Sequence, residues 1–323
     1  MVIQNRDLAA RAEAFKRGHI APHLALVVVQ LMFGTWPILG KVVLRVIPST
    51  GLVVLRVGGA AITLLLLQGR LGQLWRLPRK DLATLLLCTL LGVVVNQFLF
   101  VKGLSLTTVI NATLLSTTIP VFTLAVSIAL GHDRVSLRRL LGIVLAGSGV
   151  VYLVNPFRAN FSSQTTLGDL LIVSTAFLYA AYIAISKTLF DRYGALNVIT
   201  WIFLLASVVT LPVGPFVLQG EVLKAAGPTI WVAVLYIIIV PTVAAYYLNA
   251  WAVTRVTPGT VAIYIYLQPL IAFGLAPLLL GESWNRRTLL ASLLIFCGVG
   301  IVTKRGRSRA VREVAQHPDA LAH

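Results

Sequence analysis

Apolar stretches of about 20 residues follow one another with little interruption from Pro22 to Thr303. A hydrocarbon core ~30 Å thick is crossed by about 20 residues of α-helix, which satisfies every backbone hydrogen bond within the segment. Hydrophobic residues make up 58% of the chain and charged residues 11%, so a single soluble core could not bury all of these stretches. The sequence therefore predicts an all-α, polytopic membrane protein.

Turn residues and charge clusters divide the chain into ten predicted transmembrane helices. They cover residues 22–45, 48–69, 81–102, 107–130, 136–155, 167–189, 195–219, 228–252, 257–281 and 286–303. Pro22 is expected in the first turn of the first helix, where its missing N–H costs no hydrogen bond. Residues 1–21 are predicted to form an amphipathic cytoplasmic tail, 156–166 an outer linker, and 304–323 a basic cytoplasmic tail.

The lysines and arginines predict the orientation. With the N-terminus inside, 19 of the 27 lie on the cytoplasmic side, as the positive-inside rule requires. The net charge of +17 comes from these short segments beside the helices, so we predict no nucleic-acid partner. We expect a multi-pass protein of the cytoplasmic (inner) membrane with both termini in the cytoplasm.

The second half of the sequence repeats the first. Lys41 pairs with Lys187 at an offset of 146 residues, and Pro120 pairs with Pro269 at an offset of 149. The two repeats cover residues 22–155 and 167–303, and each contains five predicted helices. Because five is odd, the second repeat must lie inverted in the membrane, an arrangement typical of secondary transporters.

Several segments taken in order resemble the EamA family of the drug/metabolite transporter superfamily. They are "WPILGK" in the first helix, Arg56 in the second, the stretch from Pro269 to Glu282, and the glycine-rich fifth and tenth helices. The resemblance implies a ten-helix transporter that exports small metabolites, often amino acids. It further implies a central cavity lined by helices one to four and six to nine. His132 departs from the pattern, because it stands where the second repeat keeps Glu282.

Among the basic residues of the predicted helices, three are candidates for the substrate site. Lys41 and Lys187 are each close to a helix end, where an ammonium group can reach the headgroups or face the mouth of a cavity. Arg56 lies deeper, and its guanidinium stays charged. None of the ten carboxylates is mid-span, so Arg56 must bond neutral groups or bind an anionic substrate. The same absence disfavours proton-coupled export of cationic drugs and favours an uncoupled or exchange mode.

Polar and aromatic side chains within the helices complete the candidate substrate site. Each has an alternative explanation, either as a hydrogen-bonded helix contact or as an aromatic residue at the membrane interface. The prolines inside predicted helices four and nine, Pro120 and Pro269, are candidate hinges. With the three basic residues, the candidates for substrate binding are Trp36, Lys41, Arg56, Asn96, Gln97, Asn111, Thr117, Tyr179, Tyr182, Lys187, Tyr246, Asn249, Thr260, Tyr264 and Gln268.

The predicted function is export of amino acids or related amphipathic, carboxylate-bearing solutes by alternating access. Transport or exchange of phosphorylated or nucleotide-linked solutes, and drug efflux, are the alternatives within transport. A membrane enzyme is the least favoured alternative, and we predict no catalytic residue, metal site or cofactor. The expected partners are a small-molecule substrate and the lipid bilayer, with a homodimer through the glycine-rich helices five and ten as a further option.

Overall fold

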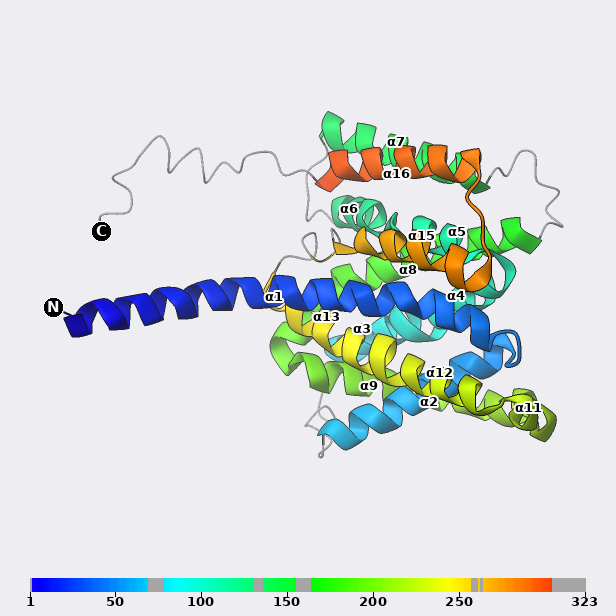
Figure 1. Ribbon diagram of the computed structural model, residues 1–323. Coiled ribbons are helices and arrows are strands. Elements are labelled where there is room, and N and C mark those ends of the chain that lie inside the picture. The colour runs from blue at the N-terminus through cyan, green and yellow to red at the C-terminus, as the bar shows by residue number, and fades with distance from the viewer. Residues whose placement is uncertain are drawn as a thin grey trace.

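The computed structural model describes residues 2–68, 78–129, 136–154, 164–256, 261 and 264–303. In these residues all regular secondary structure is helical, and short turns and loops join the helices (Figure 1). In chain order the elements are α1 Val2–Val43, α2 Ser49–Gln68, α3 Arg79–Thr89, η2 Leu90–Val94, α4 Val95–Leu106, α5 Val109–Ser116, α6 Ile119–Ala129, α7 Leu137–Val154, α8 Gln164–Tyr193, α9 Ala195–Thr210, η3 Leu211–Val213, α10 Gly214–Val217, α11 Gly220–Ala225, α12 Pro228–Ile238, η4 Ile239–Ala244, α13 Ala245–Val253, α15 Leu267–Leu280 and α16 Arg286–Thr303.

The helices confirm an all-α, polytopic membrane protein. Seven helices of the described chain are long and apolar enough to cross a membrane: Ile20–Val43, Ser49–Gln68, Arg79–Leu106, Val109–Val126, Gln164–Tyr193, Ala195–Val217 and Pro228–Val253. Shorter apolar helices cover Leu140–Leu153 and Leu267–Leu280, and α16 follows as an 18-residue helix. These segments coincide with the ten predicted helices to within a few residues, except that α15 begins at Leu267, ten residues after the predicted start of the ninth helix. The expectation that Pro22 lies in the first turn of its helix is wrong. The structure has α1 running from Val2 with Pro22 inside it, because the Ala-, Arg- and Glu-containing segment before Pro22 consists largely of good helix formers.

The helix contacts follow the two repeats. Helix α1 packs against α13 and α15, and its counterpart α8 packs against α4 and α6, so exchanging the halves reproduces the same pairs. The pairs α2 with α9 and α7 with α16 each join a helix to its own counterpart, and α5 of the first repeat packs against α15 of the second. In Figure 1 the start of α1 and the end of α16 project on the same side of the bundle. The packing is therefore that of two five-helix repeats related by a pseudo-twofold axis.

Helices α7 and α16 lie side by side at one edge of the bundle (Figure 1). A Cβ atom added at Gly298 would lie 2.3 Å from the backbone nitrogen of Ala146 and 2.6 Å from the carbonyl oxygen of Gly142. Glycine is therefore required where these two backbones meet. The small-residue faces contact each other within one chain, so a homodimer through these helices remains a prediction and would have to use their outer faces.

The fourth predicted helix is two helices. Helix α5 ends at Ser116 and α6 begins at Ile119, so Pro120 lies in the first turn of α6. Likewise Pro269 lies in the first turn of α15, after a turn at Ile265 and Tyr266. A proline in a first turn removes an N–H that has no partner within the helix. Both prolines thus start a helix after a break, and their role as hinges stays a prediction.

Matching π-helical turns interrupt the third helix of each repeat. The turn η2 at Leu90–Val94 joins α3 to α4, and η4 at Ile239–Ala244 joins α12 to α13. In η4 the hydroxyl of Thr242 donates to the carbonyl of Ile237, at 2.7 Å. Such turns often mark functional sites because they change the direction of the side chains that follow.

The lysines in matching places make matching contacts. The Nζ of Lys41 donates to the carbonyls of Leu104 at 2.7 Å and Thr107 at 2.5 Å, at the end of α4. The Nζ of Lys187 donates to the carbonyl of Val253 at 3.2 Å, at the end of α13. Each ammonium group therefore binds carbonyls at the C-terminus of the third helix in its own repeat, where the helix dipole favours a cation.

Glu282 has a comparable role at a helix start. Its two carboxylate oxygens accept hydrogen bonds from the backbone N–H groups of Val109 at 2.7 Å and Ile110 at 3.0 Å, which open α5. A carboxylate satisfies free N–H groups and favours the positive end of the helix dipole. The corresponding residue of the first repeat, His132, lies outside the described residues.

Candidate functional site

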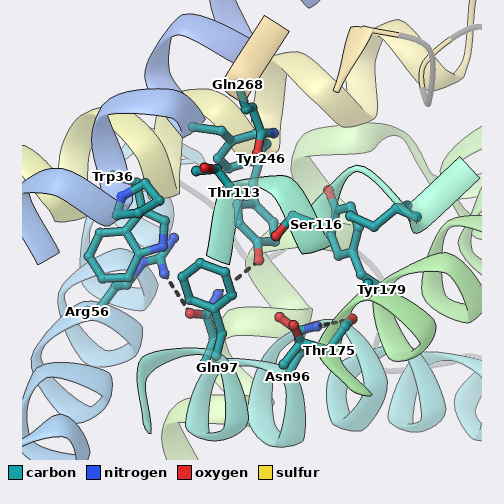
Figure 2. A pocket seen from close by; sticks show the side chains of 15 residues that line it. Trp36, Arg56, Asn96, Gln97, Thr113, Ser116, Thr175, Tyr179, Tyr246 and Gln268 are labelled. Atoms are coloured by element: carbon teal, nitrogen blue, oxygen red, sulfur yellow. Dashed lines mark hydrogen bonds between the residues drawn. The ribbon is translucent and has the colours of Figure 1, made fainter. Parts of the chain in front are cut away.

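A cavity lies at the centre of the bundle, between the two repeats (Figure 2). It receives side chains from helices α1, α2, α4, α5, α6, α8, α13 and α15. Its volume is about 80 Å³, small beside the roughly 300–1,000 Å³ of typical ligand pockets. The lining residues are Phe33, Trp36, Pro37, Arg56, Asn96, Gln97, Phe100, Thr113, Ser116, Ile119, Thr175, Ala176, Tyr179, Tyr246 and Gln268.

Arg56 brings the charge to this cavity. It lies in the middle of α2 and its exposed fraction is 2%. Its Nε donates to the hydroxyl of Thr242 at 2.6 Å, and one terminal nitrogen donates to Oε1 of Gln97, also at 2.6 Å. The guanidinium carbon lies 4.1 Å from the ring centroid of Trp36, a cation–π contact. All of these partners are neutral, so within the described residues the charge of Arg56 meets no carboxylate.

The partners of Arg56 come from both repeats. Thr242 belongs to η4 in the second repeat, and Gln97 follows η2 in the first. Gln97 in turn donates from Nε2 to the hydroxyl of Tyr246 at 3.0 Å (Figure 2). Gln97 and Tyr246 are 149 residues apart, the offset that relates Pro120 to Pro269, so they occupy equivalent positions. Arg56 therefore lies next to the pseudo-twofold axis, where the repeats meet.

The other side of the cavity carries neutral polar groups. Nδ2 of Asn96 donates to the carbonyl of Thr175 at 2.9 Å, which joins α4 to α8 (Figure 2). Tyr179 accepts a 3.4 Å hydrogen bond from Asn249. Gln268 donates to Gln30 at 2.6 Å, which joins α15 to α1. This wall can accept and donate hydrogen bonds but carries no charge among its described residues.

Aromatic rings supply most of the apolar surface. Trp36 stacks on Phe100 with ring centroids 6.2 Å apart, and Phe33 meets the ring of Tyr246 edge-on at 6.0 Å. The buried Phe203 of α9 also packs against Tyr246, with ring centroids 5.2 Å apart. The cavity thus combines one cation with a mostly aromatic wall, which suits a solute with an anionic end and an apolar body.

The structure brings seven of the predicted site residues to the cavity wall. These are Trp36, Arg56, Asn96, Gln97, Tyr179, Tyr246 and Gln268. Two more support it from behind: Asn249 bonds Tyr179, and Tyr182 packs on Gly92, where an added Cβ would lie 2.6 Å from its ring.

The other predicted site residues lie elsewhere or are not described. Lys41 and Lys187 bind helix ends away from the cavity. Asn111 bonds Asp169, the hydroxyl of Thr117 donates to a carbonyl of its own helix, and the hydroxyl of Tyr264 bonds His23. Thr260 falls outside the described residues.

Sequence reasoning missed three important residues of the site. Phe33 and Phe100 are lining residues that look in the sequence like ordinary membrane-core phenylalanines. Thr242 bonds Arg56, but its position follows from the π-turn η4, for which the sequence offers no signal beyond the adjacent Pro241. By contrast, Phe33 and Phe100 could have been found by helical spacing from Trp36 and Gln97.

A helical membrane bundle of two repeats around a central cavity is the architecture typical of a class of membrane transporters. The model of the EamA-like transporter family matches residues 21–155 and 166–304, one match for each repeat. The chain therefore belongs to the EamA-like transporter family.

Similar proteins agree with this assignment. An uncharacterized transporter of Archaeoglobus fulgidus is 29% identical over 212 residues, 65% of this chain and 71% of that protein. The uncharacterized transporter YetK of Bacillus subtilis is 27% identical and covers 81% of each chain. A protein of Streptantibioticus cattleyicolor named a probable terminal-alkyne amino-acid exporter is 26% identical over 80% of this chain and 86% of its own. Among the solved structures that share the fold is a crystal structure with a TM-score of 0.61 and 19% identity, which covers 87% of this chain and 96% of that one.

Proposed function

We propose that this transporter exports small amphipathic carboxylates, amino acids or related metabolites, across the cytoplasmic membrane by alternating access. One observation carries the proposal: Arg56 is a buried cation at a central cavity, and its described partners are all neutral. A guanidinium does not lose its proton, and burying it without a counter-ion is costly. A substrate carboxylate would supply that counter-ion and accept two parallel N–H groups.

The remainder of the cavity supports an amphipathic rather than a purely polar solute. Five aromatic side chains line it, namely Phe33, Trp36, Phe100, Tyr179 and Tyr246. Aromatic walls bind apolar bodies, and a few polar groups fix the orientation. A phosphorylated solute carries about two negative charges. The described lining residues offer it one cation, so the phosphate alternative is less well supported. A cationic drug would meet like charge at Arg56.

The small volume of the cavity supports alternating access. At about 80 Å³ the cavity has room for a few water molecules, so a solute enters after the repeats have moved apart. Both repeats contribute partners to Arg56, through Gln97 and Thr242. A carboxylate that takes the place of these partners would release a contact between the repeats. We place both termini in the cytoplasm on the distribution of basic residues.

Efflux from proteoliposomes tests this function. We would reconstitute the wild-type protein and Arg56→Gln, load the vesicles with a panel of amino acids and aromatic carboxylates, and measure efflux. A charge-assisted hydrogen bond contributes about 1.5–3 kcal/mol, so the substitution should lower transport efficiency by about 10- to 100-fold. Arg286→Gln is the matched control, because Arg286 is exposed at the start of α16. Unchanged efflux by Arg56→Gln at equal folded protein would refute the proposal.

A further inference from the structure

The charges around the cavity are unbalanced. Arg56 is the one charged side chain among the described residues that line it. Four of the acidic residues described near the two ends of the bundle are engaged elsewhere, and Glu221 is exposed in α11, outside the cavity lining. Asp81 binds Arg192 and Tyr193, Asp169 binds Thr107 and Asn111, Asp191 binds Lys187, and Glu282 caps α5. The substrate therefore meets a site with one positive charge and no carboxylate from the described lining.

This imbalance discriminates between substrates by net charge. A monocarboxylate forms a neutral pair with Arg56 in a site shielded from water. A zwitterionic amino acid brings an ammonium group as well, so the loaded site keeps one positive charge without a partner. An uncompensated charge inside a protein or membrane is strongly unfavourable, because its lost hydration is not replaced.

The neutral wall opposite Arg56 does not replace a carboxylate. The amide nitrogens of Asn96 and Gln268 are already used as donors, toward Thr175 and Gln30. The hydroxyl of Ser116 donates to the carbonyl of Ala112 at 2.7 Å. The oxygen atoms of these groups can accept from a neutral hydroxyl or amide, which suits an uncharged polar group on the substrate.

Cation–π contacts offer an ammonium group only partial compensation. Trp36 gives the strongest such surface in the cavity, but the guanidinium of Arg56 already lies over its ring at 4.1 Å. The ring of Tyr246 already makes T-shaped contacts with the rings of Phe33 and Phe203. Phe100 and Tyr179 remain, and a phenyl or phenol face attracts a cation less than an indole does.

We propose that the substrate is an amphipathic monocarboxylate whose second polar group is uncharged, such as a 2-hydroxy acid or an N-acylated amino acid. This inference rests on the proposed function and narrows its substrate class. Each transport cycle then moves one negative charge outward. An inside-negative membrane potential drives that movement by itself: at 100 mV the equilibrium ratio of outside to inside substrate concentration is about 50. No coupling ion is required.

Four probes that share a phenyl ring on a two-carbon chain test the inference by efflux from proteoliposomes. Phenyllactate carries a carboxylate and a hydroxyl, and phenylalanine replaces that hydroxyl by an ammonium group. N-acetylphenylalanine removes the ammonium charge, and phenethylamine lacks the carboxylate. We expect the transport efficiency of phenyllactate and N-acetylphenylalanine to exceed that of phenylalanine by about 10-fold or more. The reason is that an unpaired buried charge on the bound substrate lowers its affinity by more than about 10-fold.

The outcomes separate this inference from the function on which it rests. Phenylalanine transported as well as phenyllactate would overturn the inference and leave carboxylate export standing. Phenethylamine transported in preference to every carboxylate would overturn both. A potassium gradient with valinomycin, set inside-negative, should accelerate phenyllactate efflux; no response to the potential would contradict the movement of net charge.

A nearly isosteric substitution, Gln97→Glu, cancels the positive charge of the site. Oε1 of Gln97 already lies 2.6 Å from a terminal nitrogen of Arg56, so a glutamate there pairs with the guanidinium. The hydroxyl of Tyr246 can then donate to the new carboxylate. We expect phenyllactate efflux to fall by about 10-fold or more and the preference over phenylalanine to disappear.

The control for this variant is Gln219→Glu, the same change in the exposed segment before α11. It should keep the wild-type preference. Retention of the wild-type preference by Gln97→Glu, with normal size-exclusion behaviour, would overturn the inference. If the variant fails to fold, the four-probe comparison in the wild-type protein tests the inferred substrate class independently.

Discussion

The contact between α7 and α16 predicts a sharp difference between two glycines. In Gly298→Ala the new Cβ would lie 2.3 Å from a backbone nitrogen, 2.6 Å from a backbone oxygen and 2.8 Å from a Cα atom. All three atoms belong to the backbone of α7, so no rotamer change relieves the overlap and the helices must move apart. Gly147→Ala is the matched control, because an added Cβ there meets no atom within 4 Å.

The magnitude follows from overpacking. Extra methyl groups in a well-packed interface cost about 1–3 kcal/mol, and the gain from replacing a helical glycine by alanine is about 0.5–1 kcal/mol. Gly298→Ala should therefore be destabilised by up to about 2.5 kcal/mol, whereas Gly147→Ala should be neutral or slightly stabilised.

Thermal melting of the purified protein in detergent measures the difference. We expect the melting temperature of Gly298→Ala to fall by several degrees and that of Gly147→Ala to stay at or above the wild-type value. Because both helices lie at the edge of the bundle, efflux per folded molecule should change little in either variant. Equal melting temperatures for the two variants would refute the packing described for these helices.

Two further predictions concern the helix ends. Lys41→Met removes the ammonium group that binds the carbonyls of Leu104 and Thr107, so it should destabilise the protein by about 1–3 kcal/mol in thermal melting. Substrate affinity should stay within about threefold of the wild-type value. A large loss of affinity at unchanged stability would show instead that Lys41 binds substrate. Glu282→Gln keeps one acceptor but loses the negative charge at the start of α5, so we expect a decrease in stability of about 0.5–2 kcal/mol in the same assay. An unchanged melting temperature would contradict the capping role of Glu282.

Hydropathy and repeat symmetry predicted most of the architecture from the sequence. Apolar runs as long as the bilayer is thick leave few alternatives to helices, and the boundaries agree within a few residues for most of them. The start of α1 was missed because Pro22 was taken as a helix beginning, although a helix can continue through a proline. Pro120 marked the place of the break between α5 and α6, but the sequence was taken as one helix with a hinge, whereas the structure has two helices separated by Thr117 and Thr118.

The site was partly predictable. Arg56 stood out because a guanidinium in the middle of an apolar helix needs acceptors, and the structure supplies them from Gln97 and Thr242. The direction of these two side chains depends on the π-turns η2 and η4, whose hydrogen-bond register no local pattern specified. The lysines show what repeat symmetry cannot predict, because a duplication copies a structural contact as faithfully as it copies a binding site. Lys41 and Lys187 were candidates for the cavity, and each instead binds the end of a helix.

Protection of a cavity thiol by substrate tests the central claim most directly. Ser116→Cys, in a background with the exposed Cys297 replaced by serine, would place a single reactive thiol at the cavity wall, since Cys88 is buried. We predict that an aromatic monocarboxylate slows the reaction of this thiol with a small thiol reagent, and that Arg56→Gln abolishes the protection. A reaction rate that carboxylates do not change, or protection that persists without Arg56, would contradict a carboxylate site at the centre of this bundle.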